Sequence, residues 1–339
     1  MQDQSSQFEI ADPPTDGITN ITFSPTDSRL LLASSWDTTV RLYNVEENRL
    51  QTQVKHMGGI LDTCFGNDNN TAYHGGLEKK VTKLDLETST EQEMGQHDLP
   101  VRCVRWSSET NNLYTGSWDK TLRVWDERST EAVQKHDLPQ KVFSMDISNN
   151  RLVVAMANRQ IFVYDIRNMT EPWQTCETTL RYMLKSIRCM PNGEGYACSS
   201  IEGRVALEFF DMSPEQQARK YAFKSHRQTI NDTEVVYPVN ALAFHPIYGT
   251  FASGGSDGIV SVWDGVNRKR IRQFPRYPDE IASLSFSHDG KKLAIASSYT
   301  FDEGERDHQP DAIFIKTLDE NECKPRTPNN NLGNGTAYV

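Results

Sequence analysis

The feature that most constrains the fold of this chain is an internal repeat, which recurs at intervals of about 40 residues. Three segments align directly, each with a small residue, a turn that carries Asp, and an alternating strand-like run that ends in an aromatic residue followed by Asp or Asn. They are residues 35–44 (SWDTTVRLYN), 117–126 (SWDKTLRVWD) and 255–264 (GSDGIVSVWD). Self-similarity at such a fixed period indicates that one supersecondary unit is repeated along the chain.

Weaker copies fill the gaps between these segments and end at residues 85, 165 and 209. The first five copies follow one another at nearly even intervals, whereas the step to the sixth is longer and implies an insertion. A period of about 40–45 residues is typical of a four-stranded propeller blade. A seventh, degenerate copy spans residues 281–315. We therefore predict an all-β protein, a seven-bladed WD40 β-propeller.

The third repeat shows the expected strands and the polar residues that lie between them. Residues 101–106, 113–117 and 121–125 alternate with period two and are separated by turn residues, which is the pattern of strands. His97, Thr115, Asp119 and Trp125 have the spacing of the WD-repeat hydrogen-bond tetrad, in which Asp orients His, His bonds the hydroxyl, and the hydroxyl accepts the indole N–H. We interpret them as structural and keep a catalytic His/Asp pair as the alternative.

Ring closure sets the expected domain organisation. The short apolar run at residues 8–10 is predicted to supply the outer strand of the last blade, because an open propeller would leave an exposed strand edge. We expect a flexible N-terminus at 1–7, one propeller at 8–316 and a disordered tail at 317–339. Residues 212–237 are polar and are expected to form a surface excursion, with Ser213-Pro214 as a helix or turn start and a strand at 220–226. Ser213-Pro214 and Thr327-Pro328 are candidate proline-directed phosphorylation sites.

Composition excludes several classes of protein. The net charge of −10 argues against a general binder of nucleic acids or membrane surfaces, which usually carry a basic excess. The six cysteines contain no C-x-x-C pair, so we expect free thiols in a reducing compartment. The polar N-terminus lacks the features of a signal peptide, and no stretch approaches the ~20 apolar residues that span a bilayer. We expect a soluble intracellular protein.

Motifs for catalysis are absent from the sequence. No P-loop, dinucleotide-binding, H-E-x-x-H or G-x-S-x-G string occurs, and no Cys/His group has zinc spacing. The acidic residues that could pair as general acid and base mostly stand at the repeated turn positions. We expect a non-enzyme that needs no cofactor and no metal ion.

Two tryptophans and a group of cations are the candidate binding residues. Trp36 and Trp118 stand just before the turn Asp of the first and third repeats, which places them on one face of a propeller. Indoles on such a rim are typical interface anchors, although each could instead pack on its neighbouring blade. Arg204 follows the turn Glu202-Gly203, and four further cations lie nearby in the sequence: Arg181, Arg188, Lys224 and Arg227. They indicate carboxylate or phosphate recognition, or else only a solvated face.

Longer strings carry a resemblance to a known family. Residues 199–211 (SSIEGRVALEFFD), 221–227 (YAFKSHR), 237–246 (YPVNALAFHP) and 296–299 (ASSY) closely resemble the propellers of the mitotic-checkpoint protein Bub-three and the RNA-export factor of the Rae type. The similarity extends from about residue 8 to 315. Between the two, residues 164–169 (YDIRNM), 212–215 (MSPE) and 254–258 (GGSDG) look like the checkpoint member.

This resemblance implies a non-catalytic adaptor. It implies binding of GLEBS-type segments of checkpoint kinases or pseudokinases, recruitment to kinetochores through phosphorylated Met-Glu-Leu-Thr repeats of a scaffold protein, and contact with inhibitors of the anaphase-promoting complex. It also implies location in the nucleus, at mitotic kinetochores and in the cytoplasm. The resemblance places Trp36, Trp118 and Arg204 at ligand-facing positions, with Arg204 as the partner of peptide glutamates. Arg181 and Arg188 are further candidates for the peptide, and Lys224 and Arg227 are candidates for the phosphate.

Some features leave alternatives open. Thr22 occupies a position where a basic residue would help to hold phosphate, so phosphopeptide contact is expected to be weaker or differently arranged. Within the same binding class, the alternative is an export adaptor that holds a nucleoporin GLEBS segment. A substrate receptor of a ubiquitin ligase is the alternative from another class, but it would need a scaffold-binding surface for which the sequence shows no signature.

Overall fold

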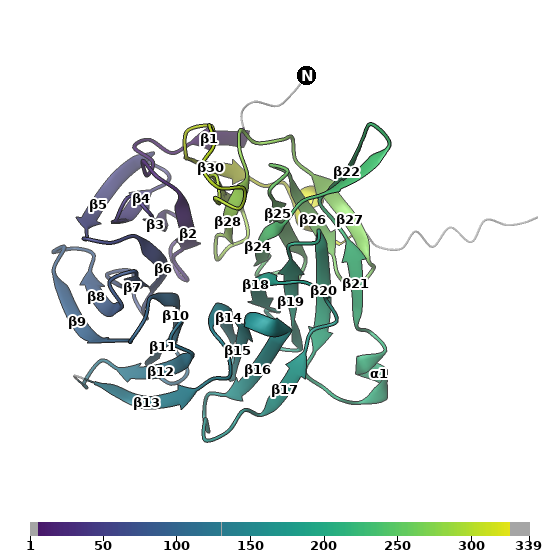
Figure 1. Cartoon of the computed structure of the whole chain (residues 1–339). Helices are drawn as coiled ribbons and strands as arrows, with labels where there is room; N and C mark the ends of the chain where they lie inside the picture. The colour runs from purple at the N-terminus through teal and green to yellow at the C-terminus, as the bar shows by residue number, and fades with distance from the viewer. Residues whose placement is uncertain (1–5, 130, 326–339) are drawn as a thin grey trace, which may run out of the picture.

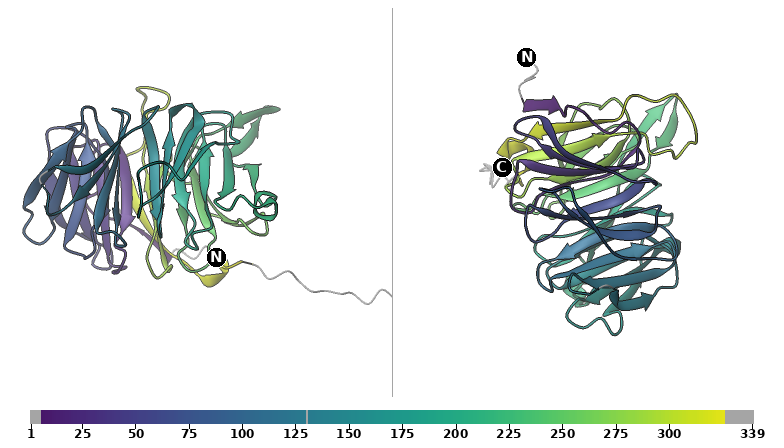
Figure 2. Two further views of the ribbon diagram at one scale, coloured as in Figure 1. Left: turned by 90° about the horizontal axis from the view of Figure 1, so that it is seen from below. Right: turned by 90° about the vertical axis from the view of Figure 1, so that its left-hand side faces the viewer.

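Seven four-stranded antiparallel sheets surround a central channel in the computed structural model, which describes residues 6–129 and 131–325 (Figure 1). Each sheet is one blade, and its first strand lines the channel while its last strand lies at the rim. The side views show the blades as a disc (Figure 2). The predicted all-β, seven-bladed fold is confirmed.

Each blade contains four strands that run in order from the channel outward. Blades one to three contain β2 (Ile18–Phe23), β3 (Leu30–Ser35), β4 (Thr39–Asn44) and β5 (Arg49–Lys55); β6 (Ile60–Phe65), β7 (Thr71–Gly76), β8 (Lys80–Asp85) and β9 (Glu91–Gln96); and β10 (Val101–Ser107), β11 (Asn112–Ser117), β12 (Thr121–Asp126) and β13 (Ala132–Asp137). Blades four and five contain β14 (Val142–Ser148), β15 (Arg151–Met156), β16 (Gln160–Asp165) and β17 (Gln174–Glu177); and β18 (Leu184–Cys189), β19 (Gly195–Ser200), β20 (Arg204–Phe209) and β21 (Tyr221–Lys224). Blades six and seven contain β24 (Val239–Phe244), β25 (Phe251–Gly255), β26 (Val260–Asp264) and β27 (Lys269–Gln273); and β28 (Ile281–Phe286), β29 (Lys292–Ser297), β30 (Ala312–Thr317) and β1 (Gln7–Glu9).

The hydrophobic core lies between neighbouring blades. Tyr114 of blade three and Val154 of blade four, for example, belong to one buried cluster. The second strand of blade three buries nearly every residue, because both faces of the sheet pack against other blades. The rim strand β5 instead alternates exposed and half-buried residues along its length. The position of a strand in its blade therefore explains its sequence pattern: the second strand is buried along nearly its whole length, whereas the rim strand alternates between exposed and half-buried residues.

Strand β1 closes the ring. Gln7, Phe8 and Glu9 pair antiparallel with Lys316, Ile315 and Phe314 of β30, so the first described residues complete the last blade. The Ile10 N–H then donates to the Ile313 carbonyl at 2.8 Å, and the Ile10 side chain is buried. The predicted N-terminal closing strand is confirmed.

The tetrad predicted for blade three is present. His97 Nδ1 lies 3.0 Å from Asp119, and His97 Nε2 lies 2.7 Å from the Thr115 hydroxyl. That hydroxyl also accepts the indole N–H of Trp125 at 2.7 Å. All four groups are therefore satisfied within the blade, as buried polar groups require.

Blade six repeats the tetrad with residues that had not been predicted to form one. His226 contacts Asp257 and Ser253, both at 2.8 Å, and Trp263 donates its indole N–H to Ser253 at 2.8 Å. The intervening insertion had hidden this relationship, because it lengthens the step between the fifth and sixth copies of the repeat. His226, which precedes Arg227, thus has a structural role in the tetrad.

The expected excursion at 212–237 is in fact divided between a blade and a hairpin. Ser213 caps the short helix α1 (Pro214–Gln217), as predicted for a helix start. The strand expected at 220–226 is β21, which is the rim strand of blade five and no part of a surface excursion. The remaining strands of this segment, β22 (Arg227–Ile230) and β23 (Thr233–Val236), form a separate hairpin that extends beyond the disc (Figures 1 and 2).

The C-terminal part of the described chain stays attached to the propeller. Beyond β30, the chain forms the short helix α2 (Glu320–Cys323), which contacts β26 and β27. Cys323 is buried, and its carbonyl accepts the Thr250 hydroxyl at 2.8 Å. The segment expected to be disordered thus packs on blade six as far as Cys323. Residues 1–5 and 326–339, with Thr327-Pro328, lie outside the described residues, and their expected flexibility stays a prediction.

Two further expectations concern cysteines and membranes. All six cysteines are free thiols, as predicted, and burial raises the pKa of Cys64 to about 12. Among the described residues, no helix has the length and apolar character needed to cross a membrane.

Candidate functional site

One end of the propeller gathers the turns between the second and third strands of every blade. Successive strands are antiparallel and the blades are repeats, so these turns share one face of the disc. Trp36 lies in this turn of blade one, and Trp118 lies in the same turn of blade three. Arg204 is the first residue after the equivalent turn of blade five. We call this side of the disc the upper face.

The two tryptophans line one cavity at the mouth of the channel on the upper face. Its volume is about 490 Å³. Trp36 is 45% exposed although it is a large apolar residue, and Trp118 is half-buried. Besides these indoles, the cavity is lined by residues from the inner strands and from the connection between β29 and β30, including Arg102, Lys185, Asn240, Tyr299 and Phe301. The predicted placement of both indoles on one face agrees with this geometry.

Two glycines make room for the Trp36 indole. A Cβ atom on Gly59 would lie 2.8 Å from Cε3 of Trp36, and one on Gly17 would lie 3.1 Å from its Cδ1. Gly59 precedes the inner strand of blade two. The indole therefore packs closely against the segment that leads into the neighbouring blade and is also 45% exposed, so the two interpretations of this residue do not exclude each other.

The connection between β29 and β30 contributes the other wall of the cavity. The Lys185 ammonium of blade five contacts both carboxylate oxygens of Asp302 at 2.7 Å, which links this connection of blade seven to blade five, on the other side of blade six. The Tyr299 hydroxyl donates to the Gly304 carbonyl at 2.7 Å, and the Arg306 guanidinium lies 4.2 Å from the centre of the Tyr299 ring. The wall is thus held by an ion pair and by an aromatic contact.

A buried carboxylate supports this wall from below. Glu280 accepts hydrogen bonds from the Thr300 hydroxyl at 2.5 Å and from the Ser256 hydroxyl at 3.2 Å, and Arg306 lies 3.4 Å away. Burial raises the pKa of Glu280, although the bonds from Thr300 oppose the shift.

Several residues of this cavity were not predicted from the sequence. Lys185, Arg102 and Phe301 were not among the candidate binding residues, because they stand at positions that the repeat pattern does not mark. The string ASSY contained Tyr299, but nothing in its spacing indicated that this residue faces a cavity.

Arg204 lies on the upper face but outside this cavity. Its Nε is 3.6 Å from the Glu202 carboxylate, and its side chain is 34% exposed. The Glu202 carboxylate also accepts the Arg181 N–H at 3.2 Å. The Arg204 side chain and the Arg181 backbone therefore share one acidic neighbour, at the end of blade five where the inner strand β18 begins.

Arg188 is not part of this group. It lies near the far end of β18, and it lines a separate cavity of about 350 Å³ at the lower end of the channel together with Arg105 and Asp146. Burial and the neighbouring Arg105 lower the pKa of Arg188. The structure therefore does not bring Arg188 together with Trp36 and Trp118, because the length of a strand, about 20 Å, separates the two ends of the blade. Peptide binding by Arg188 stays a prediction.

Lys224 and Arg227 line a third cavity, of about 210 Å³, at the junction of blades five and six. Both cations contact Glu234 of the β22–β23 hairpin, at 3.4 and 2.9 Å. Burial opposes a low pKa of Glu234, but the two cations lower it nevertheless. Lys224 is 56% exposed, whereas Arg227 is 16% exposed and also donates to the Glu202 carbonyl at 2.8 Å.

Two other residues change the interpretation of this third cavity. Arg270, an exposed cation on β27, lines it and was not predicted, because nothing in the repeat distinguishes it from other rim cations. Thr22 lines the lower cavity instead, with Arg105 and Arg188. The position at which a basic residue would help to hold phosphate therefore lies in a different cavity from Lys224.

Comparisons with known proteins agree with the propeller fold and identify the proteins to which this chain is similar. The family model "WD domain, G-beta repeat" matches residues 7–44, 89–126 and 221–264. "Mitotic checkpoint protein BUB3.1" of Arabidopsis thaliana is 49% identical and covers 95% of this chain and 96% of its own length, and "Mitotic checkpoint protein bub3" of Dictyostelium discoideum is 46% identical over 95% and 98%. "Poly(A)+ RNA export protein" of Schizosaccharomyces pombe is 34% identical over 96% and 94%. Among solved structures, that of U3-55K matches with a TM-score of 0.78 at 17% identity, covering 93% of this chain and 99% of that one, which supports the fold alone.

The contact between Gly59 and Trp36 leads to a test of the upper face. Gly59→Ala should displace the Trp36 indole, because the added Cβ would lie 2.8 Å from Cε3. We expect the fluorine NMR signal of Trp36 to shift in protein labelled with fluorotryptophan, with the signal assigned from Trp36→Phe. Gly66→Ala in the same blade is the matched control, since its Cβ would meet Tyr73 and Thr71 instead. An unchanged Trp36 signal in Gly59→Ala would contradict the described packing.

Proposed function

The chain belongs to the family of Bub3 mitotic checkpoint proteins, and from this premise we propose that it is a non-catalytic adaptor of the spindle assembly checkpoint. One observation carries the proposal. The mouth of the channel holds a cavity of about 490 Å³ in which Trp36 remains 45% exposed. Exposed indoles in a preformed hollow are the kind of residue that dominates peptide binding. The ligand is a GLEBS-type segment of a checkpoint kinase or pseudokinase.

The segment lies across the upper face from the two indoles to blade five. Apolar side chains of the peptide fill the cavity between Trp36 and Trp118, since burying an aromatic or aliphatic side chain there removes apolar surface from water. Lys185 lines the same cavity and is the second residue of the inner strand of blade five, the blade that carries Arg204. The Lys185 ammonium already forms an ion pair with Asp302. An acidic group of the peptide therefore competes with Asp302 for this ammonium.

Arg204 binds a peptide glutamate at the far end of this path. Its guanidinium has a long contact of 3.6 Å with Glu202, which leaves donors free for a second carboxylate. The backbone N–H of Arg181 donates to the same glutamate, which places this residue of the chain next to Glu202. Arg188 has no part in this contact, because it lines the lower cavity.

The cavity between blades five and six holds the phosphate of a phosphorylated Met-Glu-Leu-Thr repeat of a kinetochore scaffold. Lys224, Arg227 and Arg270 line it, and a phosphate brings about two negative charges at pH 7. The Glu234 carboxylate forms ion pairs with Lys224 and Arg227. Phosphate binding therefore displaces this carboxylate. Binding of both ligands places the protein at kinetochores in mitosis. At other times the protein is in the nucleus and cytoplasm. Inhibitors of the anaphase-promoting complex are its further partners.

An RNA-export adaptor that holds a nucleoporin GLEBS segment is the second candidate. The 34% identity to the Schizosaccharomyces pombe RNA export protein over nearly the whole chain favours it over unrelated functions. Immunoprecipitation from cells arrested in mitosis separates the two. We expect checkpoint kinases in the precipitate. Recovery of nucleoporin and messenger RNA without checkpoint kinases would replace the first proposal by the second.

Arg204 provides the direct test of peptide binding. Arg204→Ala should cost about 2–4 kcal/mol of affinity for a GLEBS-type peptide, because it leaves the peptide carboxylate without a partner in a partly desolvated groove. Isothermal titration calorimetry measures the loss. Arg128→Ala is the control, since Arg128 is an 89% exposed cation that pairs with Asp126 in blade three. Equal affinities of Arg204→Ala and wild type would remove Arg204 from the site.

Lys224 provides the test of phosphate recognition. Lys224→Glu should weaken a phosphorylated Met-Glu-Leu-Thr peptide by about tenfold more than its unphosphorylated twin, because the new carboxylate repels the phosphate. Lys135→Glu is the matched control, as Lys135 is a half-exposed lysine on the rim strand of blade three. Equal losses for the two peptides would show that Lys224 does not contact phosphate.

A further inference from the structure

Blade two departs from the tetrad found in blades three and six. His56, His74, Glu78 and Leu84 stand in blade two at the positions that His97, Thr115, Asp119 and Trp125 occupy one repeat later. An imidazole thus replaces the hydroxyl group, and an aliphatic side chain replaces the indole donor. The usual chain of hydrogen bonds cannot form, since neither the hydroxyl nor the indole N–H is present.

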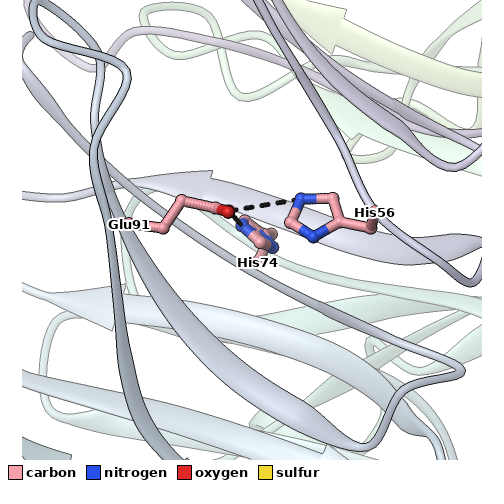
Figure 3. A group of neighbouring side chains, drawn as sticks. All are labelled: His56, His74 and Glu91. Atoms are coloured by element: carbon pink, nitrogen blue, oxygen red, sulfur yellow. Dashed lines mark hydrogen bonds and ion pairs between the residues drawn. The ribbon is translucent and has the colours of Figure 1, made fainter.

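Glu91 enters this blade from the rim strand β9. Its Oε1 lies 3.0 Å from Nε2 of His74 and 3.3 Å from Nε2 of His56. The three side chains point toward one another, and the Glu91 carboxylate oxygen faces both rings (Figure 3). One ligand atom of each residue lies within 4.8 Å of the others.

We propose that His56, His74 and Glu91 form a binding site for a divalent transition-metal ion, with zinc as the ion that fits best. Two imidazoles and one carboxylate are a zinc ligand set, and the third ligand type of zinc sites, thiolate, is not needed. Zinc bonds of about 2.0–2.1 Å in a tetrahedron separate neighbouring ligand atoms by roughly 3.3 Å. The two contacts of Glu91, at 3.0 and 3.3 Å, are close to that spacing.

His56 is oriented as a metal ligand would be. Its Nε2 is buried and has no hydrogen-bond partner among the described residues, because the 3.3 Å approach to Glu91 lacks hydrogen-bonding geometry. Its Nδ1 lies 3.8 Å from the Glu78 carboxylate. At this distance Glu78 makes no hydrogen bond with the ring. Glu78 stands at the turn position of the tetrad Asp, so the repeat itself places this negative charge near the site.

The second histidine, His74, is buried within the blade, and its Nε2 faces the same carboxylate oxygen as Nε2 of His56. The site opens to a cavity of about 330 Å³, which leaves room for water as the fourth ligand. Within the described chain, three segments that are distant in sequence would be joined by one ion: the connection before β6, strand β7 and strand β9.

The position of the site gives the ion a structural role near the upper face. His56 belongs to the segment that continues through Gly59 into β6, and Gly59 supports the Trp36 indole. Fixing His56 therefore fixes the surface on which Trp36 packs. The metal site is independent of the proposed adaptor function, because its ligands all belong to blade two and the segment that leads into it.

Metal titration of the full chain tests the proposal against the alternative of a plain hydrogen-bonded triad. Chelator-treated wild type, His74→Ser and Glu91→Gln are titrated with zinc chloride by calorimetry, and with cobalt chloride by visible absorption, which reports tetrahedral coordination. His74→Ser restores the hydroxyl that blades three and six have at this position, so we expect it to fold. His288→Ser, at an exposed histidine in another blade, is the matched control.

We expect one zinc ion per chain in wild type and in His288→Ser. His74→Ser and Glu91→Gln should each weaken zinc binding by at least the roughly 10–100-fold that loss of even an outer-shell partner costs. Zinc should also raise the thermal midpoint of wild type and leave that of His74→Ser unchanged. Circular dichroism of each variant checks folding. No binding by wild type, or equal binding by wild type and a folded His74→Ser or Glu91→Gln, would overturn the proposal.

Discussion

Closure of the ring by β1 is the interaction on which the rest of the structure depends. Each blade must bury two apolar faces, and it can do so only if it has a neighbour on both sides. The pairing of β1 with β30 completes blade seven, and Ile10 carries the connection into the core between blades seven and one, where it packs with Tyr43 and Ile313. Because the ring is closed, seven equivalent turns surround one channel mouth, and side chains from different blades meet there.

The polar positions of the repeat serve several purposes within this frame. In blades three and six they form complete hydrogen-bond tetrads. In blade one, the turn residue Asp37 forms an ion pair with Arg41 at 2.9 Å, and both side chains are buried. In blade two, two of these positions hold His56 and His74, and Glu91 from the rim strand joins them. A buried polar group must have a partner, but the repeat does not dictate which one. Loss of the hydroxyl in a single blade can therefore create a different kind of site.

The upper face, to which we assign peptide binding, is built on a rigid ring. The inner strands hold Arg102 and Lys185 at the channel mouth, and Trp36 is supported by the backbone of the next blade. The connection between β29 and β30 adds a wall whose ends are tied by Asp302 to Lys185 and by Arg306 to Glu280. Specificity resides in these connections, because the strands below them are occupied with packing. The cations of the third cavity are likewise held at a junction between blades, where the β22–β23 hairpin leaves the disc.

The sequence by itself determined the fold, since a blade-length repeat with two-residue alternation has few other solutions, and the tetrad spacing and closing strand followed from the same regularity. It also placed Trp36, Trp118 and Arg204 on one face, because equivalent positions of a repeat share a face. Only the tertiary structure separated Arg188 from Arg181, which are close in the sequence but lie at opposite ends of blade five. Only the tertiary structure joined Lys185 to Asp302, or His56 and His74 to Glu91. Such contacts depend on which strands pack side by side across blades and on the length of each side chain, and the period of the repeat specifies neither.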